Sequence, residues 1–561
     1  MPDQLLAECL DCGTYSEYSL ITPECPKCGS TWREAHYDLT NLTDKLIENL
    51  PSRPFNLWRY AEILPVKNTH PDISLGEGGT PLLRAVNLGM MLGCPNIFIK
   101  DERQGPTHSF KDRQAAVSIA AFKEAGIQEV VVASTGNVAI AYSAYAARAG
   151  IKLWAFLTSL VPAAKMREVA LYGTQVIKVT GSYDQTKKIA ADFARQRGIH
   201  IDLGSRSIPC IEAMKTIALE TAEQLTSQVG PPDNENGSKQ AVWRAPDWYF
   251  QSVSGGMGPL GVIKGFNEMY EIGLVNKLPR LGMIQVEGCS PMVHAWKQNR
   301  DLAIPVQSST TLIATLATGD PGRSYSLLRQ KMLSASGGVF ESVTDEEAFR
   351  AMHFLAKMEG ISVEPAAAVS FAGLIKLVRA GVIKPTDTIV VNCTGHTMPI
   401  ERNILGDSRS RDLDLPARAM EENPEEGLLA ALSRVGIDRF PRIAVVDDNP
   451  DARRLICRIL QSQGNFSIFE ATNGQEAVDL IHNQRPNLII LDLMMPEMDG
   501  FAVMDRLQSD PATADIPIIV VTAKELTTAE KNRLHGHIQS LMKKGDFLND
   551  DLSDEVRALL G

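Results

Sequence analysis

Short apolar runs rich in β-branched residues alternate with longer helical patterns across the central part of the chain, from about residue 40 to residue 400. The clearest runs are EVVVAS at 129–134, KLWAFL at 152–157, DWYFQSV at 247–253 and TDTIVVNCTG at 386–395. Alternation of this kind predicts a parallel sheet covered by helices. A second and smaller β/α alternation begins after Pro441 with RIAVVDD, so we predict two separate α/β folds.

The residue composition and the hydrophobic pattern change at three points, which divide the chain into four segments. At 561 residues the chain is too long for a single hydrophobic core. Residues 1–35 form a short segment that contains several cysteines and glycines. Residues 401–440 are rich in charged side chains and are typical of a linker. We therefore expect a small N-terminal module, a large α/β domain at 36–400, a linker and a second α/β domain at 441–561.

Composition excludes several classes of protein. The formal net charge of -11 argues against nucleic acid as the main partner, because a broad basic surface would be needed to bind phosphates. No apolar stretch approaches the ~20 residues that a membrane span needs, and the N-terminus lacks a secretory pattern. We expect a cytoplasmic protein that binds neither nucleic acid nor membrane.

Four cysteines lie close together near the N-terminus as two Cys-x-x-Cys pairs: Cys9, Cys12, Cys25 and Cys28. A glycine follows the second cysteine of each pair and permits a tight turn. Four thiolates suit a closed tetrahedral zinc site, and the metal would replace the core that so short a segment lacks. Because such a site has no open position, we expect residues 1–35 to form a small zinc ribbon with a structural role. Iron and unliganded thiols are the alternatives.

Lys111 lies in the segment SFKDR, at the start of a helical pattern that stops at Gly126. A lysine in the first helical turn feels the positive end of the helix dipole, which opposes protonation and favours a nucleophilic amine. A Schiff-base lysine requires this property. Taken alone, the same pattern is also that of a solvated surface lysine.

Three further motifs stand where strands end and anions are commonly bound. Residues 134–137 (STGN) follow one predicted strand and open a helix, where backbone amides collect an anion. Residues 254–258 (SGGMG) follow another strand, with Pro259 at the first helical position. Thr394 ends a third strand, at the sheet edge where open α/β folds bind ligands. Each loop alone is also compatible with an ordinary strand–helix turn.

With the segment GEGGTP at 76–81, these motifs occur in the order found in threonine synthases, and residues 35–400 resemble these enzymes and their relatives of pyridoxal-phosphate fold type II. The resemblance implies a two-subdomain α/β enzyme in which Lys111 binds the cofactor covalently. It implies that Asn137 hydrogen-bonds the ring hydroxyl and that Thr394 faces the pyridine nitrogen. It implies that four residues cradle the cofactor phosphate: Gly255, Gly256, Met257 and Gly258.

The implied reaction is γ-elimination of phosphate from O-phosphohomoserine, followed by addition of water to give threonine. The resemblance places Ser134 and Thr135 near the substrate carboxylate or phosphate and residues 364–368 (EPAAA) on the floor of the site. Two segments depart from the family, because residues 181–185 read GSYDQ instead of GNFDD and residues 395–399 read GHTMP instead of GHGLKD. Threonine dehydratase and O-phosphoserine-using synthases therefore remain alternatives.

Acidic and hydroxyl side chains end the predicted strands of the second α/β domain. Asp447 and Asp448 follow one strand, Asp492 the next, and Thr522 a third, so a parallel sheet gathers them at one edge. Three carboxylates there suit Mg²⁺.

The second domain, residues 441–561, resembles response-regulator receivers, which implies a flavodoxin-like (βα)5 fold. The resemblance implies that Asp492 is the phosphoacceptor, with Asp447 and Asp448 on the metal side. Thr522 and a lysine would read the phosphorylated state, and we expect Lys544, with Lys543 as the alternative.

Two hypotheses follow for the whole chain. In the first, an active lyase acts on a phosphorylated amino acid, and phosphorylation of Asp492 by a sensor histidine kinase or phosphotransfer protein modulates its activity or interactions. In the second, the cofactor domain senses an amino acid without turning it over. A homodimer is expected because it is common among the relatives.

Overall fold

The computed structural model describes residues 5–39, 42–159, 161–232, 241–335, 337–396, 441–463, 466–524, 526–534, 536–543 and 549–560. Two compact units are distinguished: Met1–Ala85, Cys94–Met352 and Ser362–Pro399 form the first, and Val86–Gly93, His353–Ile361 and Ile400–Gly561 form the second. The expected linker at 401–440 lies outside the described residues. Among those that are described, no helix is both long and apolar enough to cross a membrane.

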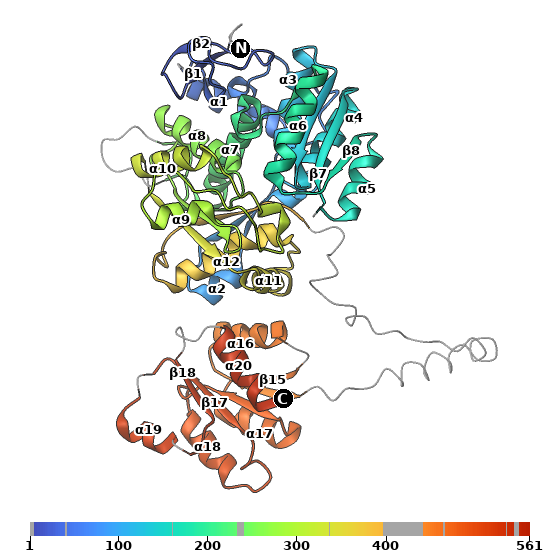
Figure 1. Ribbon diagram of the computed structural model, residues 1–561. Coiled ribbons are helices and arrows are strands. Elements are labelled where there is room, and N and C mark those ends of the chain that lie inside the picture. The colour runs from blue at the N-terminus through green and yellow to red at the C-terminus, as the bar shows by residue number, and fades with distance from the viewer. Residues whose placement is uncertain are drawn as a thin grey trace, which may run out of the picture. The chain divides into compact units, whose positions relative to one another are not determined.

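The N-terminal module is a three-stranded antiparallel sheet in the order β2-β1-β3, with β1 at Leu6–Cys9, β2 at Tyr15–Glu17 and β3 at Arg33–His36 (Figure 1). The two glycines that follow the Cys-x-x-Cys pairs adopt positive φ angles of 67° and 75°. Their amides close tight turns on Cys9 and Cys25, each at 2.8 Å from the cysteine carbonyl oxygen. The sequence pattern therefore predicted both turns correctly.

Two sheets build the enzyme domain, and both are parallel except for the edge pair β4–β5. The larger has the order β12-β11-β10-β13-β5-β4, and the smaller has the order β8-β7-β6-β9. The larger sheet comprises β4 Leu82–Arg84, β5 Ile97–Asp101, β10 Trp248–Ser252, β11 Arg280–Val286, β12 Gly338–Val343 and β13 Ile389–Cys393. The smaller comprises β6 Glu129–Ser134, β7 Lys152–Thr158, β8 Gln175–Val179 and β9 His200–Ile201. The predicted parallel α/β architecture is confirmed.

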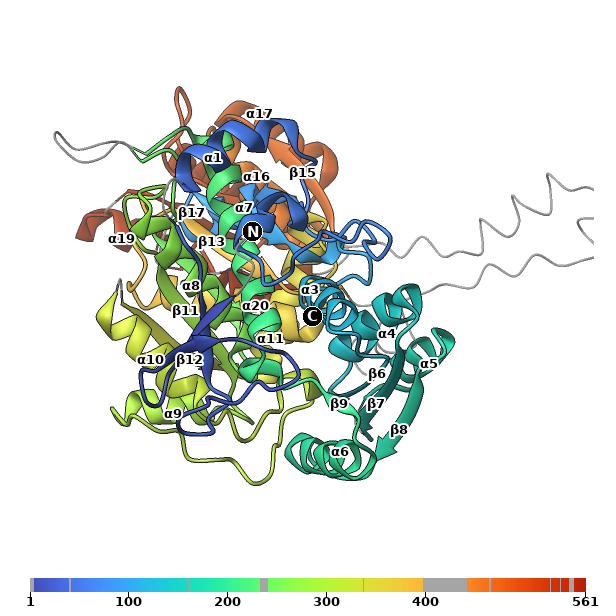
Figure 2. The same cartoon turned by 90° about the horizontal axis from the view of Figure 1, so that it is seen from above.

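Helices cover both sheets. Around the smaller sheet, α4 and α5 lie on one side and α6 on the other (Figure 2). The described helices within residues 36–400 are α1 Leu42–Asn49, α2 Val86–Leu92, α3 Lys111–Glu124, α4 Asn137–Ala149, α5 Ala163–Leu171, α6 Tyr183–Arg197, α7 Ile208–Val229, α8 Met257–Glu271, α9 Pro291–Lys297, α10 Ser324–Ser334, α11 Asp345–Phe354 and α12 Pro365–Arg379.

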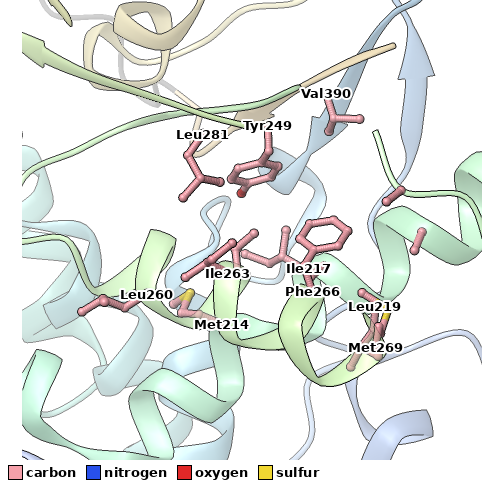
Figure 3. Packing of buried hydrophobic residues seen from close by; sticks show 14 of the residues in the cluster. Met214, Ile217, Leu219, Tyr249, Leu260, Ile263, Phe266, Met269, Leu281 and Val390 are labelled. Atoms are coloured by element: carbon pink, nitrogen blue, oxygen red, sulfur yellow. The ribbon is translucent and has the colours of Figure 1, made fainter. Parts of the chain in front are cut away.

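The largest apolar core lies between the helix pair α7–α8 and the larger sheet. Figure 3 shows the apolar side chains of α7 and α8, such as Ile217 and Phe266, facing Tyr249 and Leu281 of the sheet. The two helices approach closely because α8 carries Gly261, where an added Cβ would lie 2.4 Å from the Cβ of Met214. This packing fixes the start of α8, which borders the site described below.

A fully buried ionic network joins α3, β5 and α7. The Arg113 guanidinium lies 2.8 Å from Glu102 and 2.6 Å from Glu220, and Lys100 lies 2.7 Å from Glu220. These four side chains are almost inaccessible to solvent. Because a buried charge is tolerated only when it is paired, the network couples the start of α3 to the sheet and to α7.

We expect Arg113→Met to lower the free energy of unfolding of the enzyme domain by about 3–5 kcal/mol, because it leaves two buried carboxylates without their main partner. Arg195 is the matched control, since its ion pair with Asp192 leaves 77% and 57% of the two side chains exposed. Arg195→Met should cost less than about 1 kcal/mol. Urea denaturation of both variants measures the difference, and equal midpoints would refute the structural role of the network.

The second α/β domain is a five-stranded parallel sheet in the order β15-β14-β16-β17-β18. Its strands are β14 Arg442–Val446, β15 Ser467–Ala471, β16 Leu488–Leu491, β17 Ile518–Thr522 and β18 Ser540–Lys543. Its helices are α16 Pro450–Gln463, α17 Gly474–Gln484, α18 Gly500–Gln508, α19 Thr528–Leu534 and α20 Asn549–Leu560. This strand order is that of flavodoxin-like folds, as predicted.

Candidate active site

A cavity of about 320 Å³ opens where strands of the two sheets of the enzyme domain end, and β6, β10 and β13 all lead into it. The lining includes most of the residues singled out in the sequence: Lys111, Thr135, Asn137, Gly255, Gly256, Met257, Gly258 and Thr394. These residues are far apart in the chain, and the fold brings them to one site.

Lys111 is the first residue of α3 and is half-buried beside the Phe110 ring, with Nζ 4.2 Å from the ring centroid. Desolvation in the cavity wall lowers the pKa of Lys111 to about 8, although the negative charges of Glu364 and Asp202 act in the opposite direction. The position at the helix N-terminus also opposes protonation. A lowered pKa is the property that the expected nucleophilic amine requires, and the role itself stays a prediction.

The lowered pKa predicts how the reactivity of Lys111 changes with pH. Only the neutral amine attacks an aldehyde, so the rate at which the cofactor-free protein condenses with pyridoxal phosphate should rise through a midpoint near pH 8. An ordinary lysine, with a pKa of 10.5, would still be almost entirely protonated there. Stopped-flow absorbance across pH 6 to 10 measures the midpoint, and a midpoint above pH 10 would contradict the assignment.

The segment after β13 is held against the start of α3. The Phe110 amide donates to the Thr394 carbonyl at 3.0 Å, and the His396 amide donates to the His108 carbonyl at 3.0 Å. His108 adopts a positive φ of 61°, which is uncommon for a non-glycine residue and often marks a functional site. This pairing places Thr394 beside Lys111 at the cavity wall.

The glycine-rich loop between β10 and α8 also borders the cavity. Gly256 has a φ of 86° and precedes the first residue of α8, whose free N–H groups suit an anion. An added Cβ at Gly255 would meet no atom within 4 Å, whereas one at Gly258 would lie 2.4 Å from Nε2 of Gln251. The loop therefore exposes backbone without side chains to the cavity, so its amides are accessible to a phosphate group.

Ser134 and Thr135, which the resemblance placed near the substrate, differ in position. The Ser134 hydroxyl accepts hydrogen bonds from the amides of Gly136 at 2.9 Å and Ala139 at 3.1 Å, so it stabilises the start of α4. Among the described residues, Thr135 lines the cavity and Ser134 does not. Thr135 is thus the better placed of the two to contact a substrate.

The segment that departs from the family, residues 181–185, has a clear local role. Ser182 and Gln185 form a reciprocal capping box at the start of α6, with distances of 3.2 Å and 2.8 Å. The same helix brings Tyr183 and Lys187 to the cavity wall. The substitutions therefore stabilise a helix that contributes to the site.

Sequence reasoning missed several residues of the cavity wall. Lys187, Arg206, Asp202 and Gln114 all line it, and none belongs to a motif that the sequence made visible. A signal existed only for Gln114, which lies three residues after Lys111 and hence on the same face of α3.

A further group surrounds Asn137, made of Glu364, which was expected on the floor of the site, and Lys165, which the sequence did not indicate. The Asn137 side-chain amide donates to Glu364 Oε1 at 2.7 Å and accepts from Lys165 Nζ at 2.9 Å. Lys165 also pairs with Glu364 Oε2 at 3.2 Å. Of these three residues, Asn137 and Glu364 line the cavity, whereas Lys165 stands behind them.

The four N-terminal cysteines converge, with their sulfur atoms all within 4.8 Å of one another. Cys9 lies 3.4 Å from Cys28, and Cys12 lies 3.7 Å from Cys25. Contact with Thr14 lowers the pKa of Cys12 to about 6. This donor set fits the predicted tetrahedral zinc site in number, type and proximity.

Two arginines of the large domain contact the N-terminal module near the cysteine-bearing turns. Arg323 donates to the Leu10 carbonyl at 2.6 Å and pairs with Asp11 in the first turn. Arg206, which lines the cavity, contacts the Thr31 hydroxyl after the second turn at 3.5 Å. The N-terminal module therefore supports the enzyme site from outside.

In the second α/β domain, Asp447, Asp448 and Asp492 place carboxylate oxygens within 4.8 Å of one another. Asp447 and Asp492 are buried and Asp448 is exposed. Thr522 ends β17 and pairs in register with Lys543, the last residue of β18. Lys544, the predicted switch lysine, lies outside the described residues.

Comparisons with known proteins agree with this geometry. A family model described as "Pyridoxal-phosphate dependent enzyme" matches residues 73–395, and one described as "Response regulator receiver domain" matches residues 443–556. The threonine synthase of Methanocaldococcus jannaschii is 34% identical over 420 residues, which are 74% of this chain and 96% of that protein. The threonine synthase of Methanosarcina acetivorans is 32% identical, covering 71% of this chain and 93% of that protein.

Among solved structures, diaminopropionate ammonia lyase from Escherichia coli in complex with D-serine has a TM-score of 0.50 at 14% sequence identity. The match covers 61% of this chain and 95% of that one, and it supports the fold alone. The relatives found by sequence identify the family more closely, because they are threonine synthases at 32–34% identity. The chain belongs to the threonine synthase family of pyridoxal-phosphate dependent enzymes, and it carries a response regulator receiver domain in addition.

Proposed function

We propose that the protein is a lyase that converts O-phosphohomoserine and water into threonine and phosphate. The observation that carries this proposal is the Lys111 amine, whose pKa is lowered to about 8, in the cavity that the glycine loop borders. The strong sequence relatives are threonine synthases, which supports the choice of substrate.

The residues around the cavity fit pyridoxal phosphate. Lys111 offers an amine, the bare backbone of the loop at Gly255 offers amides for a phosphate, and Asn137 and Thr394 offer further polar groups on the same cavity wall. When bound, the cofactor supplies an electron sink that stabilises carbanions next to the substrate nitrogen. Lys111 would carry protons at the α- and β-carbons of the substrate, because its pKa is close to neutral pH.

The substrate phosphate requires cations elsewhere in the cavity. Lys187 and Arg206 line it together with the hydroxyl-bearing residues Thr135 and Thr318. Lysine and arginine bind phosphate through charge-assisted hydrogen bonds. We infer that these side chains replace the family's phosphate-binding asparagine, which residues 181–185 lack.

A substrate panel tests the proposal. O-phosphohomoserine, O-phosphoserine, threonine and serine are supplied separately, and release of phosphate and of ammonia is measured for each. We expect phosphate release from O-phosphohomoserine, with a KM at least about tenfold higher in Arg206→Gln because a charged hydrogen bond is lost. Ammonia release from threonine alone would instead establish a dehydratase, and no release from any of the four would favour the sensor hypothesis.

We further propose that the four cysteines bind structural zinc and that Asp447, Asp448 and Asp492 bind Mg²⁺. Phosphorylation of Asp492 by a histidine kinase or phosphotransfer protein would then regulate the enzyme. The contacts of Arg206 and Arg323 with the N-terminal module support a structural zinc that stabilises the cavity wall. Metal analysis of the purified protein should give one zinc per chain, which Cys12→Ser should release.

A further inference from the structure

Three side chains form a closed ring of polar contacts at the edge of the cavity. Lys165 from α5 contacts both Asn137, the first residue of α4, and Glu364, which precedes α12. Asn137 and Glu364 are themselves joined by a hydrogen bond of 2.7 Å. The ring therefore links three elements that are distant in the sequence.

The ring fixes the orientation of the Asn137 amide. A lysine ammonium has only donors and a carboxylate has only acceptors, so the amide oxygen must face Lys165 and the amide nitrogen must face Glu364. If the amide were flipped, its NH₂ group would face the Lys165 ammonium, so that two donors would oppose each other. Its oxygen would then face the Glu364 carboxylate, so that two acceptors would oppose each other. One hydrogen of the Asn137 nitrogen remains after the bond to Glu364, and Asn137 lines the cavity. The ring thus prepares a hydrogen-bond donor for a ligand.

Lys165 also balances the charge of Glu364. The Glu364 side chain is only about 6% exposed, and its negative charge acts on the catalytic Lys111. A buried carboxylate without a partner is costly, and Lys165 is the cation within 4 Å of it among the described residues. The stem of Lys165 passes close to Gly136, where an added Cβ would lie 3.3 Å from Lys165 Cδ.

We propose that Lys165 is a positioning residue for the cofactor: it locks the Asn137 amide and neutralises Glu364, so that the cavity presents a donor to the ring oxygen of pyridoxal phosphate. Lys165 itself does not line the cavity and acts through Asn137. The inference rests on the family assignment and not on the identity of the amino-acid substrate.

Cofactor binding to the cofactor-free protein tests this role without any substrate. In Lys165→Met we expect about tenfold weaker affinity for pyridoxal phosphate, measured by fluorescence titration, because a hydrogen bond to a charged group is lost. We also expect a shifted absorbance maximum of the bound cofactor, since the environment of its ring oxygen changes. Lys178→Met is the matched control, because Lys178 is an exposed lysine on the adjacent strand β8, and it should behave as the unmodified protein does.

Two further variants separate positioning from simple stability. Lys165→Arg keeps the charge and the donors and should restore most of the affinity and the original absorbance maximum. Lys165→Met combined with Glu364→Gln removes both charges and should lose less affinity than the sum of the two single losses. If Lys165→Met does not fold, Lys165→Gln serves in its place. Unchanged affinity and absorbance in the folded variant, or additive losses in the double variant, would overturn the proposal.

Discussion

Replacing Lys111 with alanine is expected to lower kcat/KM by a factor on the order of 10⁴ or more, the largest effect that we predict for a single substitution. The change removes the cavity-lining amine whose pKa is lowered to about 8. That amine has two roles in the proposed reaction, as the cofactor attachment and as the proton carrier. Because both roles are lost together, neither the rest of the cavity nor the bound cofactor can compensate.

The control for this variant lies on the same helix. Lys123 lies in the last turn of α3, whereas Lys111 begins this helix. The Lys123 side chain is exposed and pairs with Asp72 at the surface. Lys123→Ala should leave kcat/KM within about twofold, because exposed ion pairs contribute little. Steady-state assays of both variants make the comparison. A Lys111→Ala enzyme that keeps a tenth of the activity would show that another group performs the chemistry.

Asp492→Asn is expected to abolish phosphoryl uptake by the receiver domain. Asp492 follows β16, is buried, and has its Oδ1 fixed by the Met494 amide at 3.1 Å. Asparagine keeps this shape but cannot form the acyl phosphate. Incubation with Mg²⁺ and acetyl phosphate, followed by intact-protein mass measurement, should show one added phosphoryl group in the unmodified protein and none in the variant.

Asp479→Asn provides the matched control, since Asp479 is an exposed carboxylate on α17 of the same domain. It should accept a phosphoryl group as the unmodified protein does. Equal uptake by Asp492→Asn would identify a different acceptor. The same samples allow turnover to be compared with and without the phosphodonor, which measures whether the receiver regulates the enzyme and in which direction.

The sequence predicted those parts of the fold that depend on short-range patterns. The run EVVVAS coincides with β6 at Glu129–Ser134, and Lys111 begins α3 as the helical pattern indicated. The motifs at 134–137 and 254–258 lie at strand ends because local glycine and cap chemistry specify such turns. Each of these features is determined by a few neighbouring residues.

The remaining features depend on contacts between distant segments. Lys165 and Glu364 are 199 positions apart and belong to no shared pattern, yet the fold joins them at 3.2 Å. Arg206, in the turn before α7, lines the cavity and also contacts Thr31 of the N-terminal module, which is 175 positions away. The Ser134 hydroxyl was expected near the substrate, but it accepts hydrogen bonds from two amides at the start of α4. A serine hydroxyl can bind either a ligand or nearby backbone amides, and the residue type alone does not determine which.

The most direct test of the enzyme assignment is the stoichiometry of products from O-phosphohomoserine. Purified protein loaded with pyridoxal phosphate is incubated with this substrate, and phosphate and threonine are measured in the same samples, with Lys111→Ala as the blank. We predict one threonine for each phosphate released and neither product in the blank. Phosphate release without threonine, or threonine formation that persists in Lys111→Ala, would contradict the proposal that Lys111 catalyses threonine synthesis.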